Sequence, residues 1–419
     1  MAKYRHAKKL NVQLLIIIIL AVLVVAAVTV GIIITVSDNS NNKNNTVSVK
    51  PTVAPTAAPT VTPTEIVDED PEVKYAKLAQ EYMQNMSLED KIYQMLMVSP
   101  EALTGVDVVT MAGPSTEAAL SEKPVGGILY SEQNFESDEQ TNEMVLNTKS
   151  YAKYPLFIAT QKQSENIGTY TDQSEAAVFE DADAIGAELH RIGINFNLAP
   201  SAAISGDNAY NTDSTVAGML VKQAVLGLRN NGIISTLCSF PDEAENSNPY
   251  DVMKTSEFVP FVTVFTEGAD VVMMSAEKAS GIDPDYPAFM SSRMIKELLI
   301  GELKFNGLIL SPVMNYDPLN SEFTKETMVA KAIEAGVNMF ICTDDVESYV
   351  EAIKAAVDNG SISEDMINES VSKILSLKFK YNIINEGASI PQTETSTEAP
   401  TDASTDVPTE EVTATEDLY

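Results

Sequence analysis

The sequence predicts an α/β protein, a (β/α)8 barrel of the TIM type, preceded by one transmembrane helix and flanked by disordered Thr/Pro-rich segments. Two observations over residues 73–385 predict the barrel. Eight short apolar runs recur along this stretch, and segments with helical apolar spacing separate them. Such alternation indicates parallel strands joined by right-handed crossovers. A domain of this length accommodates a closed eight-stranded barrel.

The expected strands are the apolar runs Gln94–Val98, Gly126–Tyr130, Leu156–Thr160, Asn195–Ala199, Ile234–Ser239, Val271–Ala276, Gly307–Ser311 and Asn338–Thr343. Amphipathic helices are expected at Asp181–Arg191, Thr215–Asn230, Ser291–Leu303 and Val346–Asp358. The alternative architecture is an open, doubly wound sheet. No G-x-G-x-x-G or Walker sequence follows any of these runs, which removes the nucleotide-binding function typical of that alternative.

The transmembrane helix is expected at residues 14–36. No charged residue occurs there, and at about 1.5 Å per residue the run spans about the 30 Å hydrocarbon core of a bilayer. Basic residues cluster before it, within residues 1–13, and Ser-Asp-Asn-Ser follows it. The positive-inside bias therefore predicts a single-pass protein of the cell membrane, with a cytoplasmic N-terminus and an extracytoplasmic barrel. The alternative, a cleaved signal peptide, has an apolar region of only about 7–15 residues.

Two segments without apolar periodicity flank the expected barrel. Residues 37–72 are rich in Asn, Thr and Pro, which is typical of an extended linker. Residues 386–419 combine Thr and Pro with Glu and Asp, contain no Lys or Arg, and are expected to be disordered. Both segments would hold the barrel away from other structures, although a C-terminal tail without function is an equal alternative.

The composition excludes several classes of protein. A net charge of −33 argues against a nucleic-acid partner, because phosphate neutralisation needs clustered Lys and Arg. The two cysteines, Cys238 and Cys342, exclude a disulfide scaffold and a cysteine-based metal site, and we expect no cofactor. They end the fifth and eighth expected strands, which are not neighbours. Because a disulfide needs Cα atoms within about 7 Å, we expect two reduced, half-buried thiols.

Ordered motifs across the central domain resemble glycoside hydrolase family 3, the β-N-acetylhexosaminidase type. They are Met86-Ser-Leu-Glu-Asp-Lys-Ile, Val125-Gly-Gly-Ile-Leu-Tyr, Pro155-Leu-Phe-Ile-Ala, Gly193-Ile-Asn-Phe-Asn-Leu-Ala-Pro, Asp283-Pro-Asp-Tyr-Pro-Ala-Phe-Met-Ser, Glu302-Leu-Lys-Phe-Asn-Gly-Leu-Ile-Leu-Ser, Ala335-Gly-Val-Asn-Met and Glu369-Ser-Val-Ser-Lys-Ile-Leu-Ser-Leu-Lys. The resemblance implies a TIM-type barrel with a sugar site at the carboxyl ends of its strands. It also implies an Asp nucleophile and a His–Asp pair that acts as proton donor.

The positions that the resemblance assigns to catalysis lack the required side chains. Where the family has its Ser-Asp-Asp-Leu-like stretch, this sequence reads Leu310-Ser-Pro-Val-Met, so Pro312 and Val313 occupy both candidate Asp positions. A retaining glycosidase needs a carboxylate nucleophile and a proton donor on opposite sides of the scissile bond. The family's Lys-His-Phe-Pro-Gly-His run reads Cys238-Ser239-Phe-Pro-Asp-Glu here. The Asp-Ser-His that follows in the family is absent, and only Asp251 remains nearby.

The positions that would read the sugar are changed as well. Residues 161–166 read Gln-Lys-Gln-Ser-Glu-Asn in place of the family's Asp-Gln-Glu-Gly-Gly-Arg, and Asn208 stands where an Arg-Ser-Phe segment would begin. The bidentate guanidinium of that arginine is therefore lost. We assign no catalytic residue. The candidate ligand-binding residues, taken from the family's site positions, are Gln161, Gln163, Asn208, Cys238, Ser239, Pro312 and Asp317.

Three hypotheses for the function follow. The first is a membrane-anchored, catalytically inactive barrel that binds cell-wall glycan or a protein partner through its altered mouth. The second is a weak β-N-acetylhexosaminidase that uses replacement carboxylates, with Asp317, Asp242, Glu243 and Glu245 as candidates. The third is an inert structural module. Enzymatic turnover separates the first two, and binding at the strand ends separates the first from the third.

Overall fold

The barrel expected from the sequence is present and closed. The structure is a computed structural model that describes residues 70–241, 247–314 and 317–388. Eight parallel strands pair in sequence order and the first pairs with the last, which excludes the open sheet. The strands are β1 Leu96–Val98, β2 Gly127–Leu129, β3 Phe157–Thr160, β4 Phe196–Asn197, β5 Ile234–Phe240, β6 Val271–Met274, β7 Leu308–Val313 and β8 Met339–Cys342.

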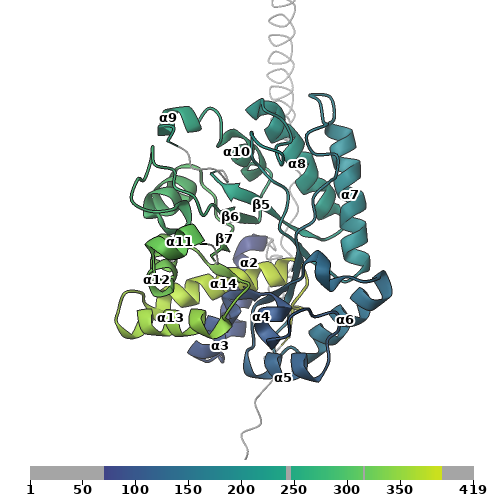
Figure 1. Ribbon diagram of the computed structural model, residues 1–419, viewed down its shortest axis with the longest axis vertical. Coiled ribbons are helices and arrows are strands. Elements are labelled where there is room, and N and C mark those ends of the chain that lie inside the picture. Colours follow the sequence, from purple (N-terminus) through teal and green to yellow (C-terminus); the bar gives the residue numbers. More distant parts are fainter. Residues whose placement is uncertain (1–69, 242–246, 315–316, 389–419) are drawn as a thin grey trace, which may run out of the picture. The chain divides into compact units, whose positions relative to one another are not determined.

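Helices surround the barrel and connect its strands (Figure 1). The α-helices are α2 Pro71–Met83, α3 Leu88–Gln94, α4 Pro100–Thr104, α5 Pro114–Glu122, α6 Asp138–Tyr151, α7 Glu175–Arg191, α8 Ser214–Asn230, α9 Tyr250–Met253, α10 Val259–Phe265, α11 Asp317–Glu322, α12 Lys325–Ala335, α13 Val346–Asp358 and α14 Glu364–Lys380. Short 3₁₀ turns lie at η1 Glu132–Asn134 and η2 Ala288–Met290, and η3 Arg293–Glu302 is a π-helix.

All eight expected strands are confirmed, with small differences at their ends. Strands β5 and β7 run further than expected, to Phe240 and Val313. Helix α13 has the expected bounds, whereas α7 begins at Glu175, six residues before the expected Asp181. The reason is that Ala, Val and Phe continue the apolar face N-terminally, and Val178 on this added turn is buried.

Local sequence explains where several helices begin and end. Asp213 caps α8 by accepting hydrogen bonds from the backbone amides of Thr215 and Val216. Helix α12 ends at Gly336, whose backbone φ is 117°. Residues with a Cβ atom rarely adopt this conformation. Such caps satisfy backbone groups at the helix ends and fix where each crossover turns back to the sheet.

The segments expected to lie outside the barrel fall almost entirely outside the described residues. These are the transmembrane helix at 14–36, nearly all of the linker at 37–72, and the tail from residue 389 onward. Within residues 70–241, 247–314 and 317–388, no helix has the length and apolar character needed to cross a bilayer.

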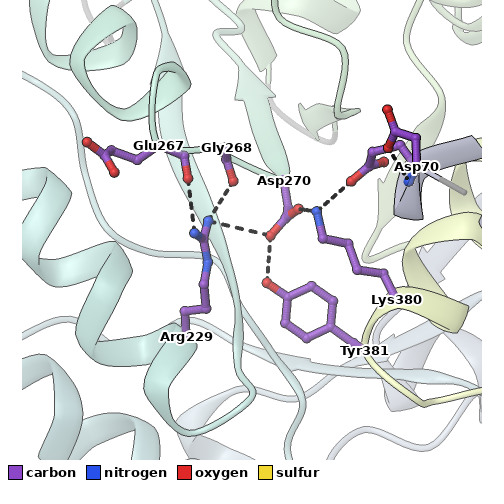
Figure 2. A network of polar contacts seen from close by, with 8 residues as sticks. Asp70, Arg229, Glu267, Gly268, Asp270, Lys380 and Tyr381 are labelled. Carbon is purple, nitrogen blue, oxygen red and sulfur yellow. Dashed lines mark hydrogen bonds and ion pairs between the residues drawn. The ribbon is translucent and has the colours of Figure 1, made fainter. Parts of the chain in front are cut away.

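A network of charged groups connects the end of helix α14 to the amino-terminal end of β6 (Figure 2). Asp270, directly before β6, is 8% exposed. Its carboxylate accepts hydrogen bonds from Lys380 Nζ at 2.7 Å and from the Tyr381 hydroxyl at 2.6 Å. Arg229 lies 3.8 Å away and also donates to the carbonyl oxygens of Glu267 and Gly268. The network therefore joins the ends of α8 and α14 to β6.

Helix α14 also buries a lysine at the amino-terminal end of the barrel. Lys378 is fully buried, and its Nζ donates to Gln94 Oε1 at 2.9 Å and lies 5.0 Å from the centroid of the Phe157 ring. The Gln94 amide in turn donates to the carbonyl oxygens of Pro124 and Val125. Burial without a carboxylate partner lowers the pKa of Lys378 to about 7.

This lysine predicts a rise in stability with pH. An unfolded lysine has a pKa near 10.4. Between pH 7 and about 10 the unfolded chain therefore binds one more proton at Lys378 than the folded chain does. The free energy of unfolding should increase by about 1.4 kcal/mol per pH unit over that window relative to the Lys378→Met variant. Urea unfolding of both proteins at pH 7, 8 and 9 measures the difference.

The matched control for this experiment is Lys354→Met, because Lys354 is exposed on α13 and pairs with Glu89. Its pH dependence should parallel that of the parent. Above pH 10 the trend should reverse, since burial raises the pKa of Tyr130 to about 12 and also raises that of Tyr210. Parallel stability curves for Lys378→Met and the parent between pH 7 and 9 would contradict the assignment.

Candidate functional site

The carboxyl ends of the strands form the barrel mouth, where the site of a (β/α)8 enzyme lies. The candidate residues follow or end β3, β4, β5 and β7, as expected from the sequence. Gln163 Oε1 accepts a hydrogen bond from the Ser201 amide at 3.3 Å, and Ser201 pairs with Cys238 in an isolated bridge. The Gln163 side chain and the Ser201 backbone therefore link the ends of three neighbouring strands, β3, β4 and β5. Gln161 and Asn208 are exposed.

The end of β7 is closed by hydrogen bonds within the protein. Ser311 Oγ donates to the Pro312 carbonyl oxygen at 2.8 Å and accepts from the Ile341 amide at 3.0 Å. Pro312 is buried, and Val313 is 41% exposed. The pairing register with β8 shifts between Leu310 and Val313. Such irregularities are common at barrel rims near active sites, and here they present an apolar side chain.

The end of β5 is also buried. Cys238 is 2% exposed and Ser239 is 5% exposed. Cys238 and Cys342, both within the described residues, form no disulfide and lie in strands that are not neighbours. The expectation of half-buried thiols is wrong in degree, because the strand ends pack more closely than their sequence position indicates. Asp242, Glu243 and Glu245 lie outside the described residues, and Asp317 begins α11.

The loop after β3 is fastened to helix α7. Asp181 accepts hydrogen bonds from the Tyr170 hydroxyl at 2.5 Å and from Asn166 Nδ2 at 2.6 Å, with Ser164 as a third donor at 3.2 Å. These bonds hold the pKa of Asp181 below its ordinary value, the Tyr170 hydroxyl contributing most. Ser164 and Asn166, which the resemblance places near the sugar, therefore hold the loop after β3 against α7.

Two aromatic rings, one from the loop after β3 and one from the loop after β4, stack on each other. Tyr170 and Tyr210 are stacked, with ring centroids 5.8 Å apart and planes inclined by 7°. Both are at least nine-tenths buried. The cavity that they line together with Gln163 has a volume of about 10 Å³, which holds no more than one water. This small cavity therefore does not hold a sugar.

Beyond β6 and β8 lie charged side chains that the sequence reasoning missed. Glu277, half-buried, follows β6, and Asp344 follows β8 and pairs with Lys325 at 2.7 Å. Acids directly after a strand, as in Thr343-Asp344-Asp345, were the available signal. Burial raises the pKa of Cys342 to about 12, so this thiol supplies no thiolate nucleophile at neutral pH. Across the described residues, no three His, Cys, Asp or Glu side chains group as metal ligands.

The family model of the glycosyl hydrolase family 3 N-terminal domain matches residues 87–377. The chain belongs to glycosyl hydrolase family 3. The match begins one residue before α3 and ends within α14, so it spans every strand of the barrel. This confirms the family resemblance and the barrel expected from it.

Two beta-hexosaminidases are similar to this chain at low sequence identity. The beta-hexosaminidase of Hydrogenovibrio crunogenus is 22% identical over 293 residues, which cover 61% of this chain and 82% of the relative. The beta-hexosaminidase of Xanthomonas campestris strain B100 is 25% identical over 229 residues, or 46% of this chain and 69% of that protein.

Solved structures of the family show the same fold. The β-N-acetylglucosaminidase of Paenibacillus sp. FPU-7 superimposes with a TM-score of 0.65 at 24% identity, covering 75% of this chain and 66% of that one. The chain thus spans slightly less than two thirds of that enzyme. The β-N-acetylhexosaminidase of Beutenbergia cavernae has a TM-score of 0.60 at 22% identity, covering 70% of this chain and 99% of that one.

Proposed function

We propose that this family 3 protein is anchored in the cell membrane by residues 14–36 and displays a barrel that binds cell-wall glycan without hydrolysing it. The observation that carries the proposal is the end of β7. Pro312 and Val313 occupy the positions that the family resemblance assigns to the nucleophile, and neither has a carboxylate. Without a nucleophile the retaining reaction has no first step.

The surroundings of β7 support the same proposal. Ser311 Oγ is engaged with the backbone of β7 and β8, and the Cys342 thiol is buried and protonated at neutral pH. Neither group is therefore available to replace an aspartate. The stacked Tyr170 and Tyr210 leave a cavity of only about 10 Å³ beside Gln163. These features favour a scaffold that has kept its fold and lost its chemistry.

Glycan is the ligand class that the relatives indicate, since two of them bear the name beta-hexosaminidase. The exposed Gln161 and Asn208 would supply hydrogen bonds to such a ligand at the rim. The acidic surface is compatible with a neutral glycan, and the N-terminal anchor would keep the barrel on the outer side of the membrane. A protein partner at the mouth is the competing outcome.

The proposal is tested on the full chain in cell membranes. External protease should remove the barrel, and the membrane fraction should release no more phenol from aryl N-acetylglucosaminides than a buffer blank. Purified cell-wall glycan should retain the detergent-solubilised chain, and exchange of Gln161 and Asn208 for alanine should weaken retention about fivefold for each lost hydrogen bond.

Three outcomes would contradict the proposal. Recovery of a soluble form that begins near residue 30 would show a cleaved signal peptide. A burst of released phenol that disappears in Asp317→Asn would show that a displaced carboxylate at the start of α11 has replaced the nucleophile. Failure of cell-wall glycan to retain the chain would favour a protein partner or an inert module.

A further inference from the structure

A cavity of about 550 Å³ lies at the end of the barrel opposite the mouth. Its lining includes residues that directly precede strands, such as Leu156 before β3 and Asn195 before β4, together with the chain that follows α14. Tyr82, Leu156 and Ile383 contribute apolar surface. This volume falls within the range of cavities that bind a ligand or a short peptide, about 300–1,000 Å³.

The lining of this cavity is basic in a chain whose net charge is −33. Lys149, Lys153 and His190 line it, and none of its described lining residues is Asp or Glu. Lys153 is paired with Asp90 at 3.0 Å. Lys149 instead donates to the Gly193 carbonyl oxygen at 2.6 Å, so its bonded partner is neutral. An incoming carboxylate would gain a charge-assisted hydrogen bond at Lys149.

The sequence that follows the cavity residue Ala388 is complementary to the cavity in charge. Ala388, the last described residue, is part of the lining. The sequence continues Ser-Ile-Pro-Gln-Thr-Glu, and residues 389–419 contain acidic side chains throughout and no Lys or Arg. Glu394 lies six residues beyond Ala388, a span of up to about 20 Å in extended chain. Glu394 is therefore within reach of the cavity from Ala388.

We propose that residues 389–398 bind back into this cavity, with Ile390 and Pro391 on its apolar wall and Glu394 or Glu398 at Lys149. Two independent features select this occupant: the position of Ala388 in the lining and the opposite charges of segment and cavity. A tethered segment has an effective concentration in the millimolar range, so a free acidic ligand must compete with it. The inference is independent of the function proposed for the mouth.

Zero-length crosslinking of the full chain tests this contact. A carbodiimide joins an amine to a carboxylate only where the two groups touch, and mass spectrometry of the digest identifies the joined peptides. Links from the tail should join Glu394 or Glu398 to Lys149. Exposed Lys354 on α13 is the matched control, and its yield of tail links should be at least about fivefold lower, the ratio that an ion pair of about 1 kcal/mol gives.

A tail variant provides a second measurement without altering the barrel. The double variant Glu394→Gln, Glu398→Gln changes only residues outside the described fold. It should accelerate amide hydrogen exchange in residues 149–156 by about fivefold, the same factor as for the crosslinks. Equal yields at Lys149 and Lys354, or unchanged exchange in the variant, would overturn the proposal. Crosslinks between isotope-labelled and unlabelled chains would also overturn it, because they would show that the tail binds a second chain. A small acidic ligand detected on the protein by native mass spectrometry would overturn it as well, because the cavity would then have another occupant.

Discussion

Replacing Pro312 with aspartate should leave hydrolysis at the level of a buffer blank, although it supplies a carboxylate at the end of β7. Proline holds φ near about −65°, and the surrounding backbone is bonded through Ser311 Oγ in a path suited to it. The new carboxylate would lack a proton donor, a contribution of about 10²–10⁴-fold. It would also lack the groups that align the sugar, worth about 7–11 kcal/mol.

The decisive comparison is a variant rebuilt as a whole. Restoring the family's residues in the 238–251 loop, at Asn208, at residues 161–166 and at Pro312 together should give a rate at least about 10²-fold above Pro312→Asp alone, because catalytic groups act as a unit. Release of phenol from aryl N-acetylglucosaminides measures both. If Pro312→Asp alone gives robust hydrolysis, the remainder of the site was intact and the non-catalytic assignment is wrong.

Replacing Asp270 with alanine should lower the free energy of unfolding by about 1.5–3 kcal/mol, the contribution of hydrogen bonds to a charged group. The exchange leaves Lys380, Tyr381 and Arg229 without their shared carboxylate at a site where Asp270 is 8% exposed (Figure 2). Lys380 keeps its ion pair with Glu72 and Arg229 keeps its two carbonyl acceptors, so the loss is that of the hydrogen bonds to the buried carboxylate. Urea unfolding of a protein truncated to residues 70–388 measures the loss of stability. This truncation retains Asp70, which caps α2, and Glu72, which pairs with Lys380.

Glu334→Ala is the control for this experiment. Glu334 pairs with Lys331 on one turn of α12, and both side chains are at least 40% exposed. Exposed pairs of this kind contribute about 0–1 kcal/mol. A loss below about 1 kcal/mol for Asp270→Ala would show that the network in Figure 2 is no stronger than a surface pair.

The position of every strand and the composition of the strand ends were predictable from sequence. A short continuous apolar run such as Val271–Met274 predicts a buried strand from neighbouring residues alone. The absence of a carboxylate at Pro312 and Val313 is likewise readable without coordinates. The π-helix at Arg293–Glu302 was not predicted, because its sequence also has the apolar spacing of an α-helix.

Only the tertiary structure decided how these parts meet. Closure of the barrel depends on pairing between β1 and β8, which are separated by most of the domain. The burial of Lys378 against Gln94, the stacking of Tyr170 on Tyr210 and the basic cavity beside Ala388 all join distant residues. The sequence by itself determined which elements form and which side chains stand at the ends of the strands. The packing of those elements determined which polar groups are buried, and therefore which are left to bind.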